Sequence, residues 1–120
     1  MTTIIILGKY QSIVILLKEV LRLSFDFVVA SKTINSEILN QYLIQFPDLW
    51  VVDHDDSLLD ALTECKEILK VDRNASILVC MGKNRMVEQE IISLGLNVIK
   101  KPFDIDEIQE TAERIIKRRN

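Results

Sequence analysis

Short apolar runs alternate with amphipathic stretches five times along this chain. The apolar runs are expected to be strands at residues 3–7, 27–30, 49–53, 77–81 and 97–99. The amphipathic stretches are expected to be helices at residues 12–23, 36–46, 58–70, 85–94 and 104–118. Residues 4–7 are apolar without alternation, which is typical of a strand that is buried on both faces of a parallel sheet. The pattern therefore predicts an α/β domain with a five-stranded parallel sheet and helices on both faces.

Residues at the expected element boundaries support these assignments. Ser57 and Asn84 can cap the third and fourth helices, and Asp104 precedes the last one. Gly95 follows the fourth helix, where a left-handed residue costs little, and Pro47 ends the second.

Helical spacing predicts which side chains face the core. In the first helix the core face is expected to hold Ile13, Leu16, Leu17 and Val20. In the last helix one buried stripe is expected to hold Ile105, Ile108, Ala112, Ile115 and Ile116, with Glu110, Glu113, Arg114 and Lys117 in solvent.

Composition narrows the class of protein. The 120 residues are 48% hydrophobic, so we expect a single domain over residues 1–120 that buries a core of its own. A net charge of −3 argues against nucleic-acid binding. No stretch approaches the roughly 20 apolar residues of a membrane span, and no basic leader precedes residues 4–7. Cys65 and Cys80 are expected to be reduced core thiols. We therefore expect a cytoplasmic protein.

The carboxyl ends of parallel strands are where open α/β sheets collect functional groups. The strand assignments bring Lys9, Asp53, Met81 and Lys101 to that edge. On topology alone Asp53 is either a site carboxylate or the cap of the loop that follows it.

A family resemblance favours the first of these interpretations. Residues 47–49 (Pro-Asp-Leu) open the third strand, Asp53 ends it, and residues 101–103 (Lys-Pro-Phe) follow the fifth strand. Over residues 3–118 the chain resembles the receiver domain of response regulators in two-component signalling. The resemblance implies a flavodoxin-like (βα)5 three-layer fold, Asp53 at the phosphoacceptor position, and a cis peptide bond between Lys101 and Pro102.

The chain departs from that family where the metal is held. Receivers bind magnesium through the phosphoacceptor Asp, an acidic pair after the first strand and a backbone carbonyl. Gly8 and Lys9 occupy the positions of the pair here, which leaves Asp53 and Asp55 as weak metal candidates. We therefore expect no cofactor, with magnesium required only if Asp53 is phosphorylated after all. Our hypothesis is that Lys9 and Lys101 pair with Asp53 in place of the ion; the alternative has Lys9 in solvent.

Two further positions depart from the family. Met81 occupies the place of the Ser or Thr that binds the phosphoryl group, and a thioether cannot donate that hydrogen bond. Val98 occupies the place of the switch aromatic. The two-state relay of receivers is expected to be missing at both positions.

Other site chemistries fit the sequence less well. Residues 54–56 (His-Asp-Asp) are consecutive, and ligands rarely converge from such a run, so we interpret them as a solvated loop. Residues 8–12 contain a single Gly and lack the spacing of a phosphate loop or a flavin site.

The resemblance also implies protein partners: a histidine kinase, a phosphotransfer protein, an output domain or a second copy of the chain. Candidate contact residues on the first helix are Val14, Ile15 and Lys18. Those on the face of the fourth helix, fifth strand and fifth helix are Arg85, Met86, Glu90 and Arg114.

We therefore expect a regulatory module that works through protein–protein interaction, without magnesium-dependent phosphorylation and without enzyme activity. One alternative is a phosphorylatable receiver with Asp53 as phosphoacceptor and an altered metal site. The other is a small ligand-binding or enzymatic flavodoxin-like domain.

Overall fold

The computed structural model describes residues 2–8, 10–25, 27–31, 47–54 and 60–119. The strands of this part of the chain are β1 (Thr3–Leu7), β2 (Phe27–Ser31), β3 (Leu49–Asp53), β4 (Ile77–Met81) and β5 (Asn97–Lys100). Its helices are α1 (Gln11–Arg22), α3 (Asp60–Val71), α4 (Arg85–Ser93) and α5 (Ile105–Arg119). Each described element lies within two residues of its predicted bounds. The helix predicted at residues 36–46 and the Ser57 cap lie outside the described residues.

The strands form one sheet in the order β2-β1-β3-β4-β5, and every neighbouring pair is parallel. This is the strand order of flavodoxin-like folds, and it confirms the predicted α/β class with a parallel sheet. The central strand β3 is buried at all of its residues, as its uninterrupted apolar run predicts.

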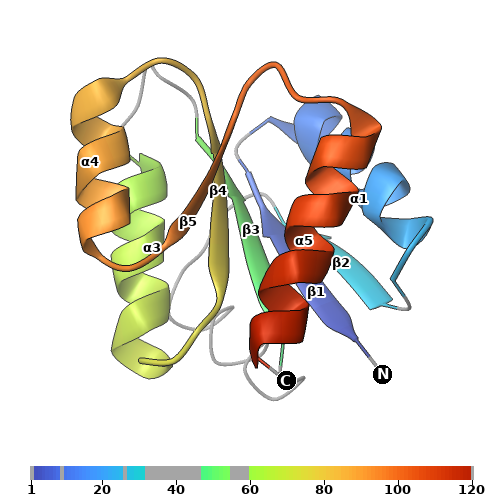
Figure 1. The fold of residues 1–120 in the computed structure, drawn as a ribbon, viewed down its shortest axis with the longest axis horizontal. Helices are drawn as coiled ribbons and strands as arrows, with labels where there is room; N and C mark the ends of the chain where they lie inside the picture. Colours follow the sequence, from blue (N-terminus) through green and yellow to red (C-terminus); the bar gives the residue numbers. More distant parts are fainter. Residues whose placement is uncertain (1, 9, 26, 32–46, 55–59, 120) are drawn as a thin grey trace.

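Helices cover both faces of the sheet (Figure 1). Helices α1 and α5 pack over one face, where Ile4 and Ile6 of β1 join a cluster with Leu17 and Ile108. Helices α3 and α4 pack over the other face, where Ile5 of β1 joins a separate cluster. The alternation of neighbouring β1 residues between two cores is the period of two expected for a strand.

The predicted boundary residues act as caps where the structure describes them. The Asn84 side chain accepts a hydrogen bond from the Val87 backbone N–H at 3.2 Å. The Asp104 carboxylate accepts one from the Glu107 backbone N–H at 2.8 Å. Gly95 follows α4 with φ of 79°. The two hydrogen bonds accepted by Asn84 and Asp104 satisfy backbone N–H groups that the first turn of a helix leaves without an intrahelical partner.

The predicted core face of α1 is wrong in part. The buried residues of α1 are Val14, Leu17, Val20 and Leu21, whereas Leu16 is 63% exposed. The helix is rotated about its axis relative to the prediction, because it must pack against both the sheet and α5. In α5 the predicted stripe is confirmed except at Ile105, which is 52% exposed in the first turn.

No described helix has the length and the apolar character needed to span a bilayer.

Candidate functional site

Of the residues predicted at the site, the described ones Asp53, Met81 and Lys101 lie together at the carboxyl edge of the sheet. Asp53 is the last residue of β3 and lies beside Cys80 of β4. Met81 ends β4, and its carbonyl accepts a hydrogen bond from the Lys101 backbone N–H at 2.8 Å. This bond holds the segment after β5 against the end of β4, so the Lys101 side chain starts close to Asp53. The peptide bond between Lys101 and Pro102 is cis.

Asp53 and Lys101 form an ion pair. The Lys101 Nζ atom lies 2.6 Å from Asp53 Oδ1, and the two side chains are 30% and 2% exposed respectively. The same ammonium donates a hydrogen bond to the His54 carbonyl at 3.1 Å. Charge-assisted bonds of this kind are short and stronger than bonds between neutral groups. One ammonium therefore contacts both the buried carboxylate and the backbone that follows it.

His54 is buried, and its expected place in a solvated loop is wrong. The residue is 1% exposed, and its backbone N–H donates to the Cys80 carbonyl at 2.8 Å. This bond continues the pairing of β3 with β4 by one residue, which draws the histidine inward. Asp55 and Asp56 lie outside the described residues.

The end of β1 lies against Asp53 through its backbone. Gly8 is buried, and a Cβ atom added to it would lie 3.2 Å from the Asp53 Cβ and 2.6 Å from the Val14 Cγ2. A glycine permits such a close approach of backbone to side chain. Lys9 lies outside the described residues, so its pairing with Asp53 stays a prediction.

The described residues do not fit a magnesium ion. Magnesium is usually held by one or two carboxylates with several waters. Gly8 supplies no carboxylate, and the Asp53 carboxylate already contacts the Lys101 ammonium. Among the described residues there is no group of three acidic, histidine or cysteine side chains placed to hold a metal. At this edge of the sheet the described residues therefore supply one carboxylate, that of Asp53.

The two positions where receivers keep their switch residues are packed with apolar side chains. Met81 is fully buried in the cluster under α3 and α4, and Val98 packs against the same cluster. A thioether in a dry apolar site offers no hydrogen-bond donor to an incoming oxygen. Met81 therefore serves as part of the core in this structure.

The thiol beside Asp53 is protonated over the ordinary pH range. Burial raises the pKa of Cys80 to about 12, and the Asp53 carboxylate adds to the effect while Lys101 opposes it. Burial also raises the pKa of Cys65 in α3 to about 12, with a smaller contribution from Glu64. Both cysteines are free and buried, as predicted, and neither has the thiolate that nucleophilic or metal chemistry requires.

The candidate contact residues on α1 are only partly accessible. Val14 is 4% exposed and belongs to the core, so its assignment to a contact surface is wrong. Leu16, which was predicted to lie in the core, is instead 63% exposed. Ile15 is 50% exposed, and Lys18 is half-buried.

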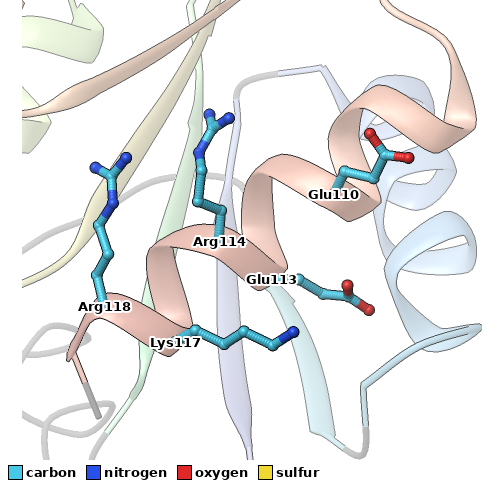
Figure 2. Close-up of a pocket in the computed structure, with 5 residues that line it drawn as sticks. All are labelled: Glu110, Glu113, Arg114, Lys117 and Arg118. Carbon is cyan, nitrogen blue, oxygen red and sulfur yellow. The ribbon is translucent and has the colours of Figure 1, made fainter.

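The second candidate surface is exposed. Met86 of α4 is 78% exposed, and Arg85, Glu90 and Arg114 are exposed as well. Figure 2 shows the guanidinium groups of Arg114 and Arg118 extending side by side from α5, while Glu113 and Lys117 lie on another side of the helix. The shallow hollow at this end of α5 is lined by Glu110, Glu113, Arg114, Lys117 and Arg118. Its charges are of both signs, so it favours neither an anion nor a cation.

Two features of the site were not predicted from the sequence, namely the burial of His54 and the filling by Val14 of the space beside Gly8. The signal that could have indicated the packing beside Gly8 is the glycine itself. A glycine directly after a buried strand marks a place where other atoms approach the backbone closely.

Comparison with curated proteins finds relatives among chemotaxis proteins. The chain is 29% identical over 103 residues to the chemotaxis protein CheY of Bacillus subtilis, which covers 84% of this chain and 86% of the relative. It is also 29% identical over 104 residues to CheY of Thermotoga maritima, which covers 85% and 87%. No protein-family model matches the chain.

Solved structures with the same fold include a response regulator receiver domain protein and a chemotaxis protein. A response regulator receiver domain protein from Clostridium thermocellum has a TM-score of 0.81 at 15% identity, covering 99% of this chain and 97% of its own. The chemotaxis protein CheY4 of Vibrio cholerae has a TM-score of 0.81 at 17% identity, covering 96% and 98%. At these identities the structural likeness concerns the fold.

Proposed function

Taking the chain as the CheY-like receiver domain that sequence and fold indicate, we propose that it is a regulatory signalling module that works without magnesium-dependent phosphorylation of Asp53. In this proposal it acts through protein–protein contacts. The Asp53–Lys101 pair maintains the geometry of the site and takes no part in group transfer.

The observation that carries the proposal is the surroundings of the Asp53 carboxylate. It contacts the Lys101 ammonium at 2.6 Å, and at the end of β1 it faces Gly8 where the family has an acidic residue. A phosphoryl group brings additional negative charge, which receivers neutralise with a metal ion together with the lysine. With one described cation and no second carboxylate among the described residues to hold an ion, transfer to Asp53 lacks its usual electrostatic support.

We further propose that the Lys9 ammonium adds a second positive charge beside Asp53. The basis is the sequence alone, because Lys9 stands at the position of a metal-binding carboxylate. A cation there would repel a divalent ion by several kcal/mol at an effective dielectric constant near 20. A Lys9→Asp variant is expected to gain magnesium affinity in a titration followed by amide NMR shifts. Absence of any gain would count against a role for Lys9.

The proposal is tested with beryllofluoride, a mimic of the phosphoryl group. Amide NMR spectra of the native protein are expected to change little when beryllofluoride and magnesium are added together. An Asp53→Asn variant is the matched control, because it removes the acceptor oxygen and keeps nearly the same shape. Widespread shifts around Asp53 in the native protein that are absent from the Asp53→Asn control would overturn the proposal.

The second candidate function is a receiver that is phosphorylated on Asp53 with an altered metal site. It is favoured by the resemblance to CheY and by the retained Asp53, Lys101 and Pro102. It requires cation ligands from the loop after β3, where Asp55 and Asp56 lie outside the described residues. The same beryllofluoride experiment separates the two candidates.

We propose two contact surfaces for protein partners. The first consists of Ile15, Leu16 and Lys18 on α1. The second consists of Arg85, Met86 and Glu90 on α4 with Arg114 on α5. An Ile15→Glu or a Met86→Glu substitution changes an exposed side chain and leaves the core untouched. Loss of partner binding in one variant alone identifies the surface in use.

A further inference from the structure

The carboxyl end of β1 is closed by a side chain from α1. A Cβ atom on residue 8 would lie 2.6 Å from Val14 Cγ2, well inside van der Waals contact, and 3.2 Å from Asp53 Cβ. Position 8 is therefore flanked by α1 on one side and by the phosphoacceptor position on the other. A larger residue there has to displace one of these two neighbours.

Val14 is poorly able to yield. It lies in α1, where a β-branched side chain has one strongly preferred χ1 rotamer. It is 4% exposed and belongs to the core cluster beneath α1 and α5. Rotation of the side chain would move a methyl group into an unfavourable rotamer, and translation would move the helix against its packed neighbours.

We infer that Val14 is a specificity-determining residue, which excludes a side chain at position 8 and thereby keeps a divalent cation from the Asp53 site. This inference rests on the proposed function, since it gives that function a steric basis in addition to the missing carboxylate. Glycine at position 8 is then a requirement of the packing. Restoring an acidic residue at position 8 requires a smaller residue at position 14.

The packing part of the inference is tested by a thermal-unfolding cycle. Gly8→Ala is expected to lower the unfolding midpoint by about 5–10 °C in the native background. In a Val14→Ala background the same change is expected to cost less than half as much, the remainder reflecting the contact with Asp53. The Val14→Ala background lacks the methyl group that a Cβ at position 8 would meet. If Gly8→Ala alone fails to fold, a folded Gly8→Ala/Val14→Ala protein would still support the inference.

Val20→Ala is the matched control for the cycle. Val20 is a second buried valine of α1 in the same cluster, and it is not among the side chains that a Cβ at position 8 would meet. Gly8→Ala is expected to cost as much in the Val20→Ala background as in the native one. An equal cost in the Val14→Ala background would overturn the inference.

The cation part is tested by magnesium titration followed by amide NMR shifts. Gly8→Asp/Val14→Ala is expected to bind magnesium about tenfold more tightly than Gly8→Asp, with Val14→Ala alone as control. Equal affinities for the first two variants would contradict exclusion by Val14. Tight magnesium binding by the native protein would contradict the proposed function, whereas the unfolding cycle would still report on the packing.

Discussion

The two halves of the carboxyl edge are held together by different interactions. At the ends of β3 and β5 the edge is ionic, because a buried carboxylate on Asp53 meets the ammonium of Lys101 at 2.6 Å. At the ends of β1 and β4 the edge is filled by packing, because Val14 occupies the space that a side chain at Gly8 would need and Met81 is fully buried. The first half therefore holds a buried acidic group in a defined position. The second half, in its described residues, presents no charged side chain at the strand ends.

A fold can thus keep the position of a site while only some of the strand ends carry polar side chains. The sheet order and the layers are those of receivers, and function still has to be argued from individual side chains. Substitutions in the ionic half and in the packed half should therefore lower stability by different amounts.

The largest effect is expected from removing the cation of the ionic half. Lys101→Met leaves the Asp53 carboxylate buried without the ammonium that it contacts, which is expected to lower the free energy of unfolding by about 3 kcal/mol. Urea unfolding at neutral pH measures this. Lys101→Met combined with Asp53→Asn is the control and should recover much of the loss. A loss below about 0.5 kcal/mol would mean that the pair does not support the fold.

A smaller effect is expected in the packed half. Met81→Thr replaces a fully buried thioether with a shorter side chain and a hydroxyl, and is expected to lower the free energy of unfolding by about 2 kcal/mol. Met81→Leu keeps the volume and should cost less than about 1.5 kcal/mol. If Met81→Thr were as stable as the native protein, Met81 would not be a packing residue.

The two buried thiols make the free energy of unfolding depend on pH above about pH 9. The pKa of Cys80 is raised to about 12 in the fold, whereas the unfolded thiol ionises near its ordinary value of 9.0. Between these values the unfolded state binds fewer protons, so stability is full below pH 9 and falls as the pH rises. The expected slope is about 1.4 kcal/mol per pH unit for each thiol. Denaturant unfolding at pH 8 to 10 should show a shallower decline for Cys80→Ala; identical slopes would contradict the buried, protonated thiol.

The smallest effect is expected at the neighbouring lysine. Lys100 pairs with Glu88 of α4 at 3.1 Å, but its side chain is 61% exposed. Solvent screens such a pair, so Lys100→Met is expected to change the free energy of unfolding by about 0.5 kcal/mol or less. The comparison with Lys101→Met uses the same substitution one residue away. Similar losses in both variants would show that burial of the carboxylate is not what distinguishes the two pairs.

Much of the ionic half could be predicted from the sequence. Apolar runs of strand length place Asp53 at the end of one strand and Lys101 after another, and parallel strands bring such ends to one edge. The burial of His54 could not be predicted in this way. It depends on the ladder between β3 and β4 continuing past Asp53, which is a property of two strands together.

The packed half was less predictable for a related reason. Helical spacing says which residues share a side of α1, but it does not say how the helix is rotated against the sheet. The packing of α1 against the sheet and α5 settles that rotation, burying Val14 and exposing Leu16.

The sequence by itself thus determined the order of the elements, the parallel sheet and the strand ends that carry Asp53 and Lys101, because these follow from local periodicity and chain direction. Only the packed layers show that Val14 fills the space beside Gly8 and that Lys101 contacts both Asp53 and the His54 carbonyl. Contacts between elements far apart in the chain depend on how close-packed layers settle against one another, and local periodicity carries no record of that.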